Sequence, residues 1–238
     1  MSQSAGFLAV GDDPSCSVGL TKPQQAALAR LLYAVRRPGG MAVLCGPGGT
    51  GVTTLLTQLL KSLAAAGSNV VRLSGRHLDH KLMAQAPERV SRDGGPGVQQ
   101  VVLLDDAHLA EAAVLADLVA SLRAESEARG IVLAGRGRLL TLLAREQDLQ
   151  QQVLLRAVLP PWTLLETEAY VLDRLAATGV GGWAAAVPLT VHEITAGIPR
   201  MVQRLVESVL LVAVTHPDHT LTCDDVERMD ERLSLAAA

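Results

Sequence analysis

The sequence predicts an α/β protein, with a parallel sheet flanked by helices and then a small all-helical domain. Up to about residue 160, short apolar runs alternate with stretches of helical periodicity, the pattern of parallel strands joined by crossover helices. Residues 46–54 (GPGGTGVTT) form a glycine-rich stretch between the first apolar run and the next helical stretch. After Pro160 and Pro161 the strand pattern stops and only helical periodicity follows.

These observations place a domain boundary at about residue 160. We expect residues 1–160 to form the α/β domain, with 1–19 as a flexible lead-in, and residues 161–238 to form the helical domain. The predicted strands are 41–45, 69–73, 101–105, 131–134 and 154–159, and the helices between them are 23–36, 53–66, 108–127 and 138–148, with a weaker one near 78–85.

The helical domain is expected to contain helices at 163–177, 189–195, 198–214 and 223–234. Thr222 precedes the last of these, and Asp225 follows it three residues later. This spacing is close to that of a capping box.

Composition excludes several classes of protein. Of the 238 residues, 49% are hydrophobic but only 2% are aromatic, which argues against a groove that stacks nucleic-acid bases. The formal net charge is −3 and the basic residues are scattered, so DNA is not an expected partner. Every apolar run is too short to cross a bilayer, and we therefore expect a cytoplasmic protein that reaches the inner membrane only through a partner.

The glycine-rich stretch has the spacing of a phosphate-binding P-loop. Gly46, Gly51 and Thr53 match the pattern G-x-x-x-x-G-K-[ST], between a predicted strand and a predicted helix. Backbone N–H groups of such a loop converge on phosphate oxygens, and the Thr53 hydroxyl would hold Mg²⁺. The predicted nucleotide-binding residues here are Gly46, Gly48, Gly49, Thr50, Gly51, Val52, Thr53 and Thr54. The alternative is an ordinary glycine turn.

Val52 stands where a P-loop normally carries lysine. That lysine reaches the β- and γ-phosphates and offsets charge as the bond breaks. Loss of one unit charge about 4 Å from a phosphate costs roughly 4 kcal/mol at an effective dielectric of 20. We expect weakened nucleotide binding and severely impaired hydrolysis, unless Lys22 or a neighbouring subunit supplies the charge. Lys61 lies two helical turns beyond the loop and is interpreted as a surface residue.

Residues 101–108 (VVLLDDAH) resemble a Walker B segment, a buried strand that ends in acids. Asp105 would hold Mg²⁺ through water, and Asp106 would orient the attacking water as a catalytic residue. Aspartate is one methylene shorter than the usual glutamate, so Asp106 would be a poorly placed base. The alternative is that both acids cap the helix that follows.

In order and at compatible spacing, four segments resemble the general-secretion-pathway protein A (ExeA-like) family of AAA+ ATPases. They are residues 20–33 (LTKPQQAALARLLY), 105–108 (DDAH), 166–175 (ETEAYVLDRL) and 197–202 (GIPRMV). The resemblance implies a P-loop AAA+ fold, a helical lid, ATP or ADP with Mg²⁺ as cofactor, and assembly into rings or filaments. The family's relatives include TniB- and MuB-like transposition regulators.

The resemblance also assigns roles to residues outside the two loops. Arg200 matches the sensor 2 arginine that touches the γ-phosphate, although it could simply be a surface residue at a helix start. Gly135-Arg136-Gly137 replaces the usual Gly-Gln-Pro of sensor 1. Gln152 stands where the family has its candidate arginine finger, and Arg145 or Arg156 could replace it.

Three catalytic positions thus depart from the family pattern: Val52, Asp106 and Gln152. Because all three act on one transition state, we interpret the chain as a pseudo-ATPase with weak or absent hydrolysis. It would act as an assembly or scaffolding component through self-association or protein partners, in secretion or cell-envelope assembly, with or without bound nucleotide. The alternatives are a slow ATPase completed in trans by a partner or paralogue, and a transposition-type DNA-binding regulator.

Overall fold

The computed structural model describes residues 20–78, 98–178, 182–216 and 219–235. The chain forms two compact units. The first comprises Met1–Gly46 and Val52–Leu159, and the second comprises Pro47–Gly51 and Pro160–Ala238. The loop segment 47–51 thus groups with the helical part of the chain.

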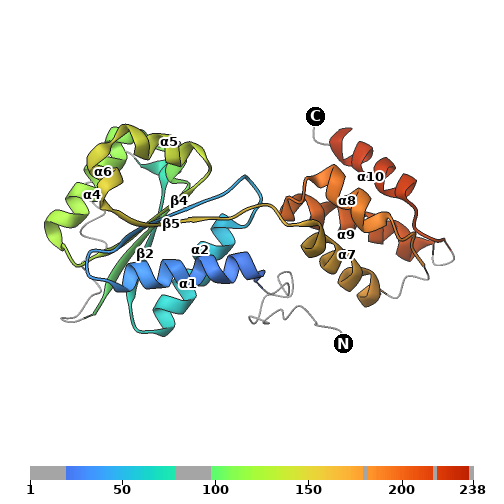
Figure 1. Cartoon of the computed structure of the whole chain (residues 1–238), viewed down its shortest axis with the longest axis horizontal. Coiled ribbons are helices and arrows are strands. Elements are labelled where there is room, and N and C mark those ends of the chain that lie inside the picture. Colours follow the sequence, from blue (N-terminus) through green and yellow to red (C-terminus); the bar gives the residue numbers. More distant parts are fainter. Residues whose placement is uncertain (1–19, 79–97, 179–181, 217–218, 236–238) are drawn as a thin grey trace. The chain divides into compact units, whose positions relative to one another are not determined.

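The first unit contains a five-stranded, wholly parallel sheet, as predicted (Figure 1). Its strands are β1 (Met41–Cys45), β2 (Asn69–Ser74), β3 (Gln100–Asp105), β4 (Gly130–Gly135) and β5 (Val153–Val158). Their spatial order is β2-β3-β4-β1-β5, which places β2 and β5 at the two edges. Each predicted strand is confirmed to within one residue at either end.

Helices cover both faces of this sheet. They are α1 (Lys22–Arg36), α2 (Val52–Ala65), α4 (Ala112–Glu125), α5 (Arg138–Arg145) and α6 (Gln147–Gln152). Along β1, Met41 and Val43 pack with α4, α5 and α6, whereas Ala42 and Leu44 pack with α1 and α2. Side chains alternate across a strand, so two-sided burial requires the continuous apolar runs seen in the sequence.

Two predicted helices are interrupted. The helix predicted at 108–127 begins as a 3₁₀ turn, η2 (Ala107–Leu109), and Ala110 is then extended before α4 starts at Ala112. The helix predicted at 138–148 ends at Arg145, because Glu146 adopts an extended conformation before α6. Apart from residue 78, the weaker helix predicted near 78–85 lies outside the described residues.

The second unit contains the four helices that the sequence predicts. They are α7 (Leu164–Thr178), α8 (Val187–Thr195), α9 (Pro199–Thr215) and α10 (Cys223–Leu235). Its core is aliphatic apart from Trp162 and Tyr170, whose ring centroids are 5.3 Å apart. In the described parts of the chain, no helix combines the length and apolar character needed to span a membrane.

The start of α10 confirms the capping pattern predicted from Thr222 and Asp225. The backbone N–H and the hydroxyl of Thr222 both donate to Asp225 Oδ2, at 2.9 and 2.8 Å. His219 Nε2 lies 2.8 Å from the same oxygen. Burial of the carboxyl group acts to raise its pKa, but the bonds from His219 and Thr222 outweigh burial and lower the pKa of Asp225 from 3.8 to about 2.

A depressed pKa means that the ionised Asp225 stabilises the folded state above pH 3.8, and that this contribution is lost as the pH falls towards 2. We therefore expect Asp225→Asn to lower the thermal midpoint at pH 6 to 7. The difference from the parent protein should shrink between about pH 4 and pH 2. Thermal denaturation followed by circular dichroism across this range measures both midpoints, and a constant difference would contradict the assignment.

Candidate nucleotide site

The predicted P-loop turns back between β1 and α2. Gly49 and Gly51 have φ angles of +91° and +92°, a left-handed conformation that favours glycine. The Thr50 hydroxyl closes the turn by donating to the carbonyl oxygen of Pro47 at 2.8 Å. The chain then enters α2 at Val52, so the first N–H groups of a 14-residue helix follow the loop directly. This strand–loop–helix geometry suits an anion.

Val52 supplies apolar contact where the predicted site needs charge. It is half-buried and packs against the core cluster that α1 and α2 form with the sheet. The two lysines considered as substitutes, Lys22 and Lys61, are exposed on α1 and α2.

Within the second unit, Arg200 adjoins the loop. Its backbone N–H donates to the carbonyl oxygen of Gly49 at 3.2 Å. A Cβ atom on Gly49 would lie 2.9 Å from Ile198 Cγ2 and 3.1 Å from Arg200 Cβ. Glycine is therefore needed at position 49 for close approach as well as for its φ angle. The structure brings Arg200 to the predicted loop through the start of α9, and its side chain is exposed.

The first unit brings Thr53 and Asp105 together. Asp105 ends β3, and its Oδ1 accepts the backbone N–H of Asp106 at 2.9 Å. The Thr53 hydroxyl lies 3.4 Å from the same oxygen. A hydroxyl and a carboxylate oxygen are the ligand types that Mg²⁺ takes beside a nucleotide. On this side of the carboxylate, the residues fit the predicted metal pair.

The other side of the carboxylate is occupied by an arginine that sequence reasoning missed. Arg72 Nη2 lies 2.5 Å from Asp105 Oδ2, and Arg72 Nη1 lies 3.3 Å from Thr57 Oγ1 on α2. Parallel pairing places Arg72 opposite Leu103 and Ser74 opposite Asp105, so the guanidinium reaches the end of β3 from the neighbouring strand. The sequence feature that could have revealed this contact is Arg72 itself, a charged residue inside the apolar run of β2.

Asp106 is also held by an arginine. Arg76 Nε lies 2.7 Å from Asp106 Oδ2, and this hydrogen bond raises the pKa of Arg76. Asp106 adopts a left-handed conformation, with φ at 51° and ψ at 28°, which aspartate tolerates better than most residues. The carboxylate predicted to orient a water thus forms an ion pair with its own chain.

His108 follows the two acids in the sequence and is buried. Burial lowers its pKa, so the imidazole is neutral at pH 7. Its buried Nδ1 has no hydrogen-bond partner among the described residues, and a Cβ atom on Gly135 would lie 2.9 Å from that nitrogen. Gly135, in the predicted sensor 1 segment, therefore packs directly on His108 of the predicted Walker B segment.

The remaining predicted positions lie on the surface of the first unit. Gln152 ends α6, Arg145 ends α5, Arg156 lies on the edge strand β5, and Arg136 follows β4. All four side chains are exposed. Their roles stay predictions.

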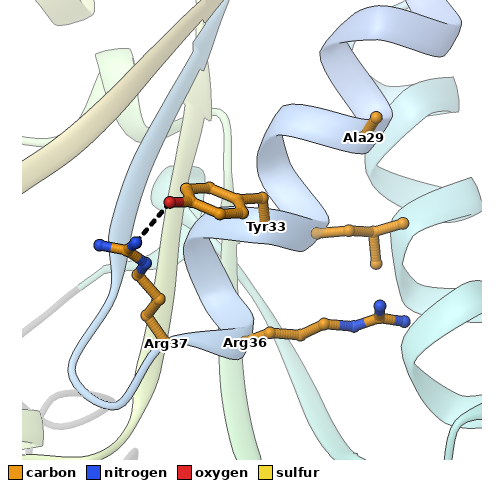
Figure 2. Close-up of a pocket in the computed structure, with 5 residues that line it drawn as sticks. Ala29, Tyr33, Arg36 and Arg37 are labelled. Atoms are coloured by element: carbon orange, nitrogen blue, oxygen red, sulfur yellow. Dashed lines mark hydrogen bonds between the residues drawn. The ribbon is translucent and has the colours of Figure 1, made fainter.

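A separate hollow lies at the C-terminal half of α1 (Figure 2). Figure 2 shows the Tyr33 hydroxyl turned towards Arg37, which donates a hydrogen bond to it, while Arg36 extends the other way. The guanidinium carbon of Arg37 is 4.7 Å from the centre of the Tyr33 ring. The lining residues are Ala29, Leu32, Tyr33, Arg36 and Arg37, and none of them is a predicted site residue.

No family model matches the chain. General secretion pathway protein A of Aeromonas hydrophila is 25% identical to it over 228 residues, covering 84% of this chain and 42% of that protein. The predicted resemblance is confirmed: the chain is similar to this protein over most of its own length. It spans less than half the length of this relative.

Solved structures confirm the AAA+ fold. The Thermotoga maritima RuvB Holliday junction branch migration motor superposes with a TM-score of 0.64 at 22% identity, over 88% of this chain and 69% of RuvB. Aeropyrum pernix ORC2, solved with ADPNP and ADP, superposes with a TM-score of 0.55 at 15% identity, over 88% of this chain and 66% of ORC2. The four helices of the second unit are consistent with an AAA+ lid.

The contact between Gly75 and the acidic segment can be tested directly. A Cβ atom on Gly75 would lie 2.4 Å from the carbonyl oxygen of Asp106. We expect Gly75→Ala to displace Asp106 and to lower the free energy of unfolding by about 1–3 kcal/mol, the usual cost of overpacking. Urea denaturation measures this change.

Gly137→Ala is the matched control, because no heavy atom lies within 4 Å of its added Cβ and its backbone is helical. We expect this variant to keep the stability of the parent protein. Equal stability of the Gly75 and Gly137 variants would contradict the described packing of Gly75 on Asp106.

Proposed function

We propose that this chain is a degenerate AAA+ protein that binds nucleotide weakly, hydrolyses it poorly or not at all, and acts as an assembly or scaffolding component. One observation carries the proposal: both Walker B carboxylates form ion pairs with arginines of the same chain, Arg72 and Arg76. A carboxylate held in this way is poorly suited to bind a metal or to orient a water.

The P-loop supports the same conclusion. Transfer of a phosphoryl group depends on positioned positive charge more than on covalent chemistry. The loop retains its glycines and its helix, which serve binding, but Val52 packs against the core. The loss of the lysine therefore weakens nucleotide binding less than it slows hydrolysis. The backbone N–H groups that hold the phosphates remain, while the cation at position 52 is absent.

The nucleotide would be ATP or ADP, with Mg²⁺ if a metal is bound. The loop and Thr53 would hold the phosphates, and Arg200 would act as sensor 2. Support comes from the contact between Arg200 and Gly49, and from ORC2, whose structure contains ADPNP and ADP.

Protein partners are supported by exposed apolar side chains. On the second unit Leu165, Leu211 and Leu235 are 75%, 72% and 79% exposed. On the first unit, Leu154 and Val158 are exposed on the edge strand β5. Exposed apolar side chains mark an interface where they lie together in one patch. We propose that they serve self-association or a complex with an intact paralogue.

The similarity to general secretion pathway protein A supports a role in secretion or cell-envelope assembly. We propose that the chain works in the cytoplasm and reaches the inner membrane through a protein partner.

The loss of the P-loop lysine is tested by restoring it. We expect Val52→Lys to tighten binding of Mg·ATP at least tenfold, and by up to about a thousandfold, because a full charge returns beside the phosphates. Titration calorimetry with Mg·ATP and Mg·ADP measures affinity, and phosphate release on the same samples measures turnover. The parent protein should release phosphate no faster than the buffer blank.

Val52→Leu is the control for this experiment, since it changes size without adding charge, and it should bind as the parent does. Clear turnover by the parent protein would overturn the proposal of a pseudo-ATPase. It would also raise the question of which residue replaces the lysine.

A slow ATPase completed in trans is the main alternative, and it makes a separate prediction. Turnover would appear only when an intact paralogue is added, and Asp105→Asn in this chain would abolish the increase. On our proposal, the same mixture hydrolyses ATP at the paralogue's own rate, with or without this substitution. Steady-state phosphate release from the mixture distinguishes the two.

A DNA-binding regulator is the second alternative. RuvB is named as a Holliday junction branch migration motor, but only the fold is shared at 22% identity. The net charge of −3 does not favour a polyanionic partner. Salt-dependent DNA binding in a filter assay would revive this alternative.

A further inference from the structure

Both oxygens of the Asp105 carboxylate have partners within the first unit. Its Oδ1 faces the Asp106 N–H at 2.9 Å and the Thr53 hydroxyl at 3.4 Å, and its Oδ2 accepts Arg72 Nη2 at 2.5 Å. The side chain is only 10% exposed. A divalent cation that used both carboxylate oxygens would have to displace the guanidinium.

Arg72 is fixed at two points on different elements. Besides Asp105 on β3, its Nη1 lies 3.3 Å from Thr57 Oγ1, and the Thr57 hydroxyl donates to the Thr53 carbonyl oxygen at 2.9 Å. Thr57 lies one helical turn after Thr53, so the guanidinium spans the space between α2 and the end of β3. Arg72 therefore holds one oxygen of the Asp105 carboxylate, and Thr53 approaches the other.

Arg76 adds a second ion pair beside the first. Arg76 pairs with Asp106 at 2.7 Å, so two guanidinium groups and two carboxylates lie at the same end of the β2–β3 pair. Their formal charges cancel. A Walker B site that recruits Mg²⁺ relies on uncompensated negative charge, and here the chain supplies the compensation itself.

We propose that Arg72 takes the place of the divalent cation at this site, so that phosphate-bearing ligands bind there without a metal. The guanidinium neutralises Asp105 with one positive charge, where Mg²⁺ would bring two. It carries five N–H donors, and its contacts with Asp105 and Thr57 use two of them. Guanidinium N–H groups suit phosphate oxygens and keep their charge at every physiological pH.

This inference extends the proposed nucleotide site, and its test has one arm that needs no nucleotide. Mn²⁺ alone is titrated into the protein, and free Mn²⁺ is followed by electron paramagnetic resonance. We expect Arg72→Gln to bind Mn²⁺ at least tenfold more tightly than the parent. Adding Asp105→Asn to that variant should remove the gain, because the carboxylate is then lost.

Arg30→Gln is the matched control, since it removes one positive charge from the exposed side of α1. It should bind Mn²⁺ as the parent does. Arg72→Lys keeps the charge and should also bind Mn²⁺ weakly. This variant is used if circular dichroism shows that Arg72→Gln does not fold. Parent and Arg72→Gln proteins that bind Mn²⁺ equally, or an Arg72→Lys variant that gains affinity, would overturn the proposal.

The second arm measures ATP binding by calorimetry in MgCl₂ and in EDTA. The affinity of the parent should change less than about threefold between the two, whereas Arg72→Gln should depend on Mg²⁺ by tenfold or more. Loss of parent binding in EDTA would contradict metal-free binding. If the parent binds no ATP in either buffer, the proposed nucleotide site and this metal-free binding both fail, and the Mn²⁺ arm still decides whether Arg72 excludes the metal.

Discussion

Burial of both faces of the parallel sheet is the constraint on which the rest of this structure depends. β1 and β4 are buried along their whole length, and β3 is buried from its second residue onward. Charged side chains therefore have room only at strand ends and on edge strands. Asp105 ends the inner strand β3, and Arg72 lies on the edge strand β2 beside it. Opposite charges therefore lie together at one corner of the sheet, because its buried strands exclude charged side chains elsewhere.

At that corner, two arginines balance the charges of the two acids. An isolated carboxylate as buried as Asp105 would be costly without a positive charge beside it. Arg72 meets the need from the neighbouring strand, and Arg76 does the same for Asp106. Asp106 in turn packs on Gly75, so the two acids, the two arginines and the glycine form one closely packed group. The two arginines thus supply the positive charge that balances both acids.

Features that depend on nearby residues could be predicted from the sequence, and features that depend on strand order could not. The five strands follow from apolar runs, and the cap at Thr222 and Asp225 follows from a spacing of three residues. The break at Ala110 was missed because residues 108–127 contain no glycine or proline to mark it. Arg72 was missed for another reason: its meaning appears only when β2 is placed beside β3.

The source of the positive charge also determines what the site can do with it. A P-loop lysine is a flexible ammonium that can follow charge as it moves onto a leaving phosphate. Arg72 is held by Asp105 and Thr57, so its charge is committed to the protein's own carboxylate. A fixed guanidinium can complement a bound anion. Its interaction with that anion is, however, little stronger in the transition state than in the ground state. Since only such a difference accelerates a reaction, this geometry separates binding from turnover.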